Sequence, residues 1–249
     1  MRVGFGRGVA IAATALLTSG CFVQAGFAGE GNVLYLVQDT SPGSTSGQSF
    51  QSDQHLSINS SIGTLLRPVT QSGDDNSASI TIDSACTIVT QDCGHASLTQ
   101  NNDYQDALAG SGLKPWQQDI VGAALGRLNS QFGGNSAVVS VTGGGTASVA
   151  QYGFGNDASV SATDASASIN QIGLGNTASL SVTPLGSGAP ASFALNQIGL
   201  NNTAGLVVLA TAGTSSSYTQ VGANGTHGSP TDPVSITTTS SVNVTHYSF

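Results

Sequence analysis

The chain of 249 residues is acidic and poor in charge: its formal charge is −8, only 7% of its residues are charged and 33 are glycine. This composition is too polar and too rich in small residues for a conventional globular core, yet too apolar for a disordered chain. The acidic balance argues against a nucleic-acid partner, because phosphates require a basic patch.

Residues 1–28 have the pattern of a secretory signal peptide. Arg2 and Arg7 precede an apolar run from Val9 to Leu17, which is too short to span a bilayer. The small residues at the end of this segment suit a signal peptidase, and we expect cleavage after Ala28. The segment from Thr18 to Cys21 can instead be read as a lipoprotein box, which would place a lipid on Cys21.

Residues 29–64 form an N-terminal segment ahead of the main repeats. Leu34, Leu36 and Gln38 share the face pattern of the later repeats, which predicts a degenerate first rung. The stretch from Ser41 to Gln54 is rich in serine and glycine, and we expect it to form a loop.

Between residues 65 and 225 the chain repeats the phrase Gln-x-Gly-x-x-Asn-x-Ala. Full copies begin at Gln71, Gln151, Gln171 and Gln197, and shortened copies begin at Gln91, Gln131 and Gln220. Several of these glutamines are 20 residues apart, although other spacings are 40, 26 and 23 residues. A period of about this size indicates a stacked array.

Each repeat reads as two strands joined by a glycine-rich turn. Apolar and polar residues alternate before the glutamine, so that Ile169 and Gln171 lie on one face of a strand. The alternation resumes after the turn, where Asn176 and Leu180 share a face. Gly173 and its equivalents supply the positive φ angles that a tight reversal needs.

Stacking at the strand spacing of about 4.8 Å would place identical amide side chains above one another. A buried amide without a partner costs about 1–3 kcal/mol, so paired amides would fix the register of the stack. We therefore predict an all-β solenoid with inward ladders formed by Gln71, Asn76, Gln91, Gln131, Asn135, Gln151, Asn156, Gln171, Asn176, Gln197, Asn202 and Gln220.

This phrase, with an alternating strand on each side, closely resembles the curlin repeat of bacterial curli and curli-like surface fibres. The resemblance covers Leu65 to about Gly225, but the second glutamine of the curlin repeat is replaced at most positions and is kept only by Gln100. The resemblance implies a divergent, non-catalytic fibre subunit that associates with itself or with other curlin-like subunits. It also implies an outer-membrane secretion machinery and a Gram-negative cell surface reached through the periplasm.

Two segments depart from the repeats. From about residue 101 to 128 they are interrupted, and Pro115 opens a helical pattern in which Trp116, Ile120, Ala124 and Leu128 recur on one face. We expect a short helix that lays this apolar face on the stack. Residues 226–249 form a tail that is rich in threonine and serine and resembles a strand.

The sequence offers no pattern typical of an enzyme, a cofactor site or a small-molecule site. Gly153-x-Gly155-x-x-Ala158 formally matches the dinucleotide fingerprint, but a strand pattern follows where a helix is required. The four histidines are dispersed along the chain, and no nucleophile elbow is present. We expect neither cofactor nor metal.

Two functions from different classes remain. The first is a structural protein, an exported subunit that adds edge to edge into an extracellular amyloid-type fibre or biofilm matrix. The second is a monomeric exported β-solenoid adhesin that binds a surface or glycan along a flat Ser/Thr face, with its ends capped by the helix and the tail.

The cysteines generate a prediction for the exported chain. Removal of Cys21 would leave Cys86 and Cys93, and an even pair in an oxidising compartment favours a disulfide. A metal held by Cys86, Cys93 and His95 lacks a fourth nearby ligand. We expect the mass of the exported chain to increase by two hydrogens on reduction. Free thiols in secreted material would contradict the pairing.

Overall fold

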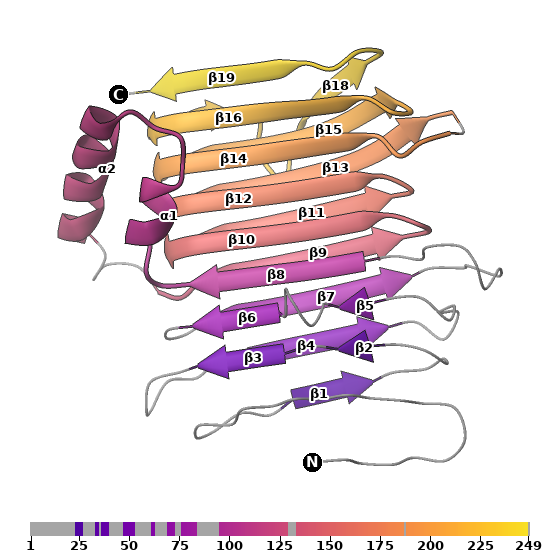
Figure 1. Cartoon of the computed structure of the whole chain (residues 1–249), viewed down its shortest axis with the longest axis horizontal. Coiled ribbons are helices and arrows are strands. Elements are labelled where there is room, and N and C mark those ends of the chain that lie inside the picture. The colour runs from indigo at the N-terminus through magenta and orange to yellow at the C-terminus, as the bar shows by residue number, and fades with distance from the viewer. Residues whose placement is uncertain are drawn as a thin grey trace.

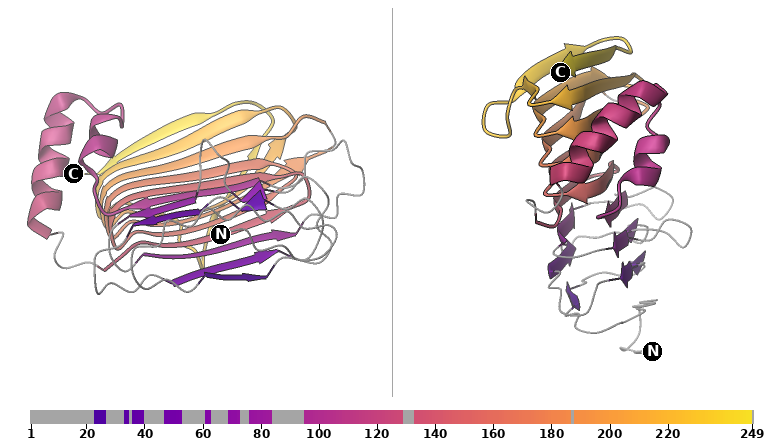
Figure 2. Two further views of the ribbon diagram at one scale, coloured as in Figure 1. Left: turned by 60° about the horizontal axis from the view of Figure 1, so that its bottom comes forward. Right: turned by 90° about the vertical axis from the view of Figure 1, so that its left-hand side faces the viewer.

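The computed structural model describes residues 23–26, 33–34, 36–39, 47–52, 61–62, 69–72, 76–83, 95–128, 133–186 and 188–248. Within these ranges the chain is a β-solenoid of two parallel sheets that face each other, with two helices on one side (Figures 1 and 2). The predicted all-β stacked fold with a short helical insertion is confirmed.

Sheet A contains the second strand of each coil and its order follows the chain. Its strands are β1 (Val23–Gly26), β4 (Gly47–Ser52), β7 (Ser77–Asp83), β9 (Ser136–Thr142), β11 (Asp157–Thr163), β13 (Thr177–Leu185) and β15 (Thr203–Thr211). Two short strands, β17 (Thr226–His227) and β18 (Val234–Thr238), both pair with β15 and complete this sheet.

Sheet B contains the first strand of each coil. Its strands are β2 (Val33–Leu34), β3 (Leu36–Asp39), β5 (Ser61–Ile62), β6 (Val69–Ser72), β8 (His95–Asn101), β10 (Thr146–Phe154), β12 (Ser166–Leu174), β14 (Ser192–Leu200), β16 (Ser215–Ala223) and β19 (Asn243–Ser248). Here a coil means one strand of sheet B, or two short strands in line, together with the turn that follows and the next strand of sheet A.

The stack extends beyond residues 65–225 at both ends. β3 pairs with β6 so that Gln38 lies beside Gln71, and β19 pairs with β16. The stretch from Ser41 to Gln54, expected to be a loop, contains β4, whose Phe50 pairs with Ile80 of β7. The loop prediction was wrong there because pairing with a neighbouring strand outweighs the low strand propensity of serine and glycine.

β1 lies inside the segment that the sequence predicts to be removed as a signal peptide. It pairs with β4, with Ala25 beside Phe50. Removal of residues 1–28 would therefore leave the outer edge of β4 without this neighbour.

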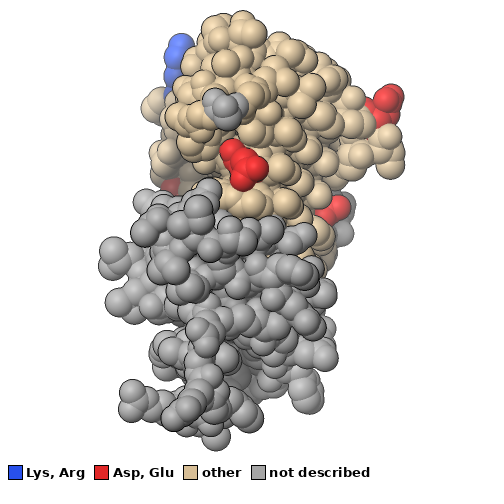
Figure 3. All heavy atoms as spheres, turned by 90° about the vertical axis from the view of Figure 1, so that its right-hand side faces the viewer, with Lys and Arg blue, Asp and Glu red and all other residues tan. Residues whose placement is uncertain are grey.

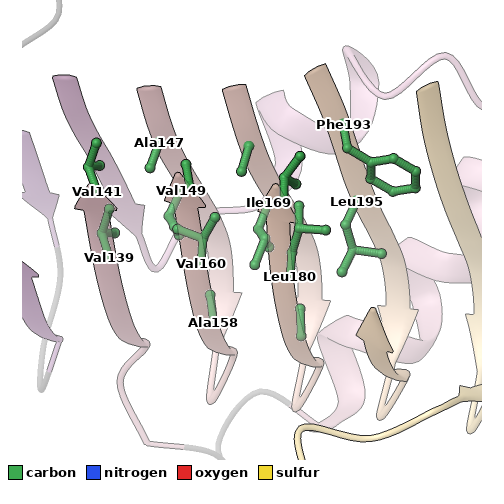
Figure 4. Packing of buried hydrophobic residues seen from close by; sticks show 14 of the residues in the cluster. Val139, Val141, Ala147, Val149, Ala158, Val160, Ile169, Leu180, Phe193 and Leu195 are labelled. Carbon is green, nitrogen blue, oxygen red and sulfur yellow. The ribbon is translucent and has the colours of Figure 1, made fainter. Parts of the chain in front are cut away.

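The core lies between the two sheets and is built from the alternating residues of each strand. In β12, Ala167 and Ile169 are buried while Ser166 and Ser168 are partly exposed. Side chains from β9 to β14 meet in this layer, as Figure 4 shows for Val139, Val149, Ile169, Leu180 and Leu195. Parallel in-register pairing makes each apolar side chain stack on its counterpart one coil away.

The turn between the two strands of a coil depends on glycine at one repeated position. Gly153, Gly173, Gly199 and Gly222 have φ between 110° and 131°. A Cβ on Gly173 would lie 1.9 Å from the carbonyl oxygen of Gly199. Glycine is thus required both for its conformation and for the close approach of the next coil.

The helical insertion occupies the turn between β8 and β9, in the middle of a coil. It consists of α1 (Gln105–Ala109) and α2 (Pro115–Leu128), and α2 packs on β12 and β14. Gln117 caps its start by accepting a hydrogen bond from the Lys114 N–H at 3.0 Å.

The predicted helix is present, but the predicted contact face was wrong. Trp116 and Ile120 are 54% and 53% exposed, whereas Val121 and Leu125 are buried. The buried pair contacts an apolar stripe along the turns of later coils, formed by Ile172, Leu174, Ile198 and Val221. The position of this stripe, rather than the helical periodicity, determines which face of α2 is buried.

Substitution of Gly173 by alanine tests the requirement for close approach between coils. We expect Gly173→Ala to lower the free energy of unfolding by at least about 3 kcal/mol, because strain at positive φ adds to a clash with backbone. The control is Gly112→Ala, which has a φ of 77° but no atom within 4 Å of the added Cβ. It should cost only about 1–2 kcal/mol in urea unfolding. Equal losses would contradict the close-approach argument.

Candidate functional site

A ladder of glutamine amides runs through the core from coil to coil. The Nε2 of Gln100 donates to Oε1 of Gln151 at 2.8 Å, and the same link joins Gln151 to Gln171, Gln171 to Gln197, and Gln197 to Gln220 at 2.9, 2.9 and 3.1 Å. All five side chains are fully buried. Every link therefore donates toward the C-terminal end of the stack.

The same amides tie the two sheets together. Nε2 of Gln151 also donates to the carbonyl oxygen of Ser136 at 2.7 Å, and Nε2 of Gln171 donates to that of Asp157 at 3.0 Å. Ser136 and Asp157 open strands of sheet A. Each glutamine thus bonds along the stack and across the core.

An asparagine ladder runs beside it in the opposite direction. Nδ2 of Asn156 donates to Oδ1 of Asn135, Asn176 to Asn156, and Asn202 to Asn176, at 3.0, 3.0 and 3.1 Å. The same amides reach the turns, since Asn156 also donates to the Gly173 carbonyl at 3.0 Å. These links donate toward the N-terminal end of the stack.

The predicted ladder residues have different outcomes. Asn76, Asn135, Asn156, Asn176, Asn202, Gln151, Gln171, Gln197 and Gln220 are buried as predicted. Gln71 lies in register between Gln38 and Gln100. Gln91, Gln131, Cys86 and Cys93 lie outside the described residues.

Gln100 is the ladder residue that the sequence prediction missed. It lies in register with Gln151, so β8 places Gln100 at the position expected for another glutamine of this region. The signal was present, because Ala96-Ser97-Leu98-Thr99-Gln100 matches Ala167-Ser168-Ile169-Asn170-Gln171. It was hidden because the helical insertion follows Gln100 directly and displaces the rest of the phrase to Asn135.

Both ladders lose their regular pairing of amides near the C-terminal end of the stack. Gly225 replaces the next asparagine, and its N–H donates to Oδ1 of Asn202 at 3.2 Å, which closes that ladder. Gln220 has no acceptor for its Nε2 among the described residues, although it is fully buried. A Cβ on Gly225 would lie 2.6 Å from this nitrogen.

An aromatic pair, of which Tyr218 is buried and His227 is partly exposed, lies beside this break. Tyr218 stacks on His227 with ring centroids 4.7 Å apart. Burial raises the pKa of the Tyr218 phenol, whose hydroxyl has no partner within the part of the chain that the structure describes. Where side chains are described, the buried polar atoms without a partner all lie in the last two strands of sheet B.

The core is open at this end of the solenoid. Val234 pairs with Leu206 and Val244 pairs with Tyr218, so both valines point into the core layer. Leu206 and Tyr218 are 1% and 2% exposed, but Val234 and Val244 are 37% and 46% exposed. The difference arises because no further coil covers the valines in the described structure.

A small apolar hollow of about 240 Å³ lies between α2 and the turn edge. Ile120, Val121, Leu125, Leu200 and Ala223 contribute to its lining, with Gly199 and Gly222. It provides apolar contacts alone, without a group suited to acid–base or nucleophilic chemistry. Among the described residues there is no cluster of three metal-ligating side chains, and no helix there is long and apolar enough to cross a membrane.

Comparison of the chain with protein-family models, with curated proteins and with solved structures finds no match. The ladders and the open core at the C-terminal end of the stack together form the candidate site.

Removal of one ladder amide tests the contribution of the ladder to stability. Gln171→Leu deletes links to Gln151 and Gln197 and leaves their buried amide atoms short of partners. We expect unfolding to become easier by about 2–4 kcal/mol in urea titration. Ser168→Ala, on the outer face of the same strand, should change stability by no more than about 0.5 kcal/mol. A similar small change for both variants would show that the ladder adds little.

Proposed function

We propose that the chain is a non-catalytic, exported structural protein: a curlin-like, minor subunit of an extracellular amyloid-type fibre or biofilm matrix. It associates with itself or with related subunits through the ends of its stack. The observation that carries the proposal is the open core at the C-terminal end, where inward-facing Val234 and Val244 are exposed.

The terminal strands also present backbone edges suited to pairing. β18 and β19 contain no Asp, Glu, Lys or Arg, which are the residues that commonly protect an edge strand. Another parallel strand added there would continue the existing ladder of backbone hydrogen bonds. Edge pairing and core coverage thus favour the same partner, a further coil of the same design.

The helices leave this end uncovered. α2 packs against β12 and β14, and its buried residues contact the turn stripe along the side of the stack (Figures 1 and 2). A solitary solenoid requires a polar cap on its terminal coil. The position of α2 therefore supports association over the capped monomer.

Departures from a regular repeat favour a specialised role rather than the bulk of a fibre. The insertion between β8 and β9 adds bulk to one side of the column. Gly225 takes the place of a ladder asparagine after β16, and His246 takes that of a ladder glutamine in β19, so successive subunits would meet at a junction that differs from the interior.

A regular outer face supports the adhesin as the second candidate. Ser159 pairs with Ser179 and Ser161 with Ser181, which forms ranks of hydroxyl groups on sheet A. In the view of Figure 3, the described part of the surface is largely uncharged, with scattered acidic side chains and a basic one at its margin. Such a face suits a neutral glycan or surface.

Placing a charge at the open end tests the structural proposal. We expect the parent to form thioflavin-positive fibrils with a reflection near about 4.7 Å. Val244→Glu should raise the protein concentration needed for seeded growth at least about a hundredfold, because addition would bury an unpaired carboxylate. Thr245→Glu, the next residue on the outer face of β19, should behave nearly as the parent.

Two results would contradict the proposal. If the parent stays monomeric at high concentration even when seeded, the adhesin becomes the better interpretation. If Val244→Glu grows as readily as Thr245→Glu, association does not use the open core.

A further inference from the structure

The glutamine ladder has a direction, and this makes the two ends of the stack different. Each described link donates from one amide to the Oε1 of the next coil toward the C-terminus. The last glutamine of the ladder therefore keeps an unused donor, its Nε2, one strand before the C-terminal end of the stack. A second copy complements this donor only with the end that carries the first glutamine of its ladder.

His246 occupies the next ladder position. It pairs with Gln220 in the register of β16 and β19, and so lies on the same inward side, but it is exposed. A neutral imidazole has one nitrogen that accepts and one that donates, as a link in an amide ladder requires. It can accept from Gln220 and donate to the next coil, whereas a protonated imidazole only donates.

The surroundings of His246 contain few other groups that titrate. Gln220 faces it from β16, and Tyr218 stacks on His227 across the core. The inward residues of β18 are Val234 and Ile236, and Tyr247 follows His246 on its own strand.

Acidic groups come from two places, neither of them at the ladder position. Asp232 lies in the loop that packs on Gly205, on the outer side of sheet A. In an added copy whose β3 continues the register of β19, Gln38 would follow His246 and Asp39 would follow Tyr247. His246 is thus the group at the junction whose charge decides whether the ladder continues.

We propose that a second copy of this chain adds head to tail, with its β3 strand on β19, and that neutral His246 carries the amide ladder from Gln220 across the junction to the added copy. The inference rests on the proposed function and specifies its interface. A head-to-head junction would place donor against donor and is disfavoured. Protonation of the imidazole removes its only acceptor, so acid blocks the junction.

The test compares seeded growth of the purified protein at pH 8 and pH 5, by thioflavin fluorescence and by the mass of pelleted fibre. Growth of the parent should slow at least about tenfold at pH 5, because one buried donor would then face another donor without an acceptor between them. His246→Gln should grow at the parent's pH 8 rate under both conditions. His246→Lys should grow at least about tenfold more slowly at pH 8, because it fixes the charge.

His227→Gln is the matched control, since it removes the other histidine of the last coil and should retain the acid sensitivity of the parent. Far-UV circular dichroism establishes that each variant keeps its sheet content. Acid sensitivity that persists in His246→Gln, or that disappears in His227→Gln, would overturn the assignment to His246. Rapid growth of His246→Lys, or equal growth of the parent at both pH values, would also overturn it. A parent that fails to grow at either pH contradicts the proposed function itself.

Discussion

The structure depends on the pairing of buried amides between successive coils. A glutamine in this core has two donors and an acceptor, and the fold satisfies them by joining each amide to its equivalents above and below and to the opposite sheet. A slip of one residue would turn every glutamine outward and every serine inward. A slip of a whole coil would leave the helices against the wrong turns. The ladders therefore fix register in a core whose small aliphatic residues alone would specify it weakly.

The same constraint explains why the ends matter. A solenoid is stabilised by contacts between neighbouring coils, so a terminal coil receives only half of them. At the C-terminal end the consequences occur together: exposed valines, and a Gln220 amide nitrogen and a Tyr218 hydroxyl that have no partner among the described residues. These features are costly in an isolated chain. The addition of another coil would remove them, which connects the local chemistry to the proposed role in a fibre.

The helical insertion is matched to a particular part of the stack. The residue after the ladder glutamine is Ser72 and Asn101 in the earlier coils, but Ile172, Ile198 and Val221 in later ones. α2 packs on the apolar series. Because α2 originates between β8 and β9, it lies over coils that follow it in the chain. It packs on the side of the solenoid.

The sequence by itself determined the strand–turn–strand unit, the inward amides and the existence of a helix, because these follow from alternation, from glycine and from local periodicity. Only the tertiary structure decided the features that depend on neighbours several coils away. It assigned Gln100 to the ladder, made β4 a strand within a serine-rich stretch, and turned Val121 and Leu125 of α2 inward instead of Trp116 and Ile120. It also left the core open above Val244. Periodicity specifies which residues share a face of one element, whereas the surface that covers that face belongs to another part of the chain.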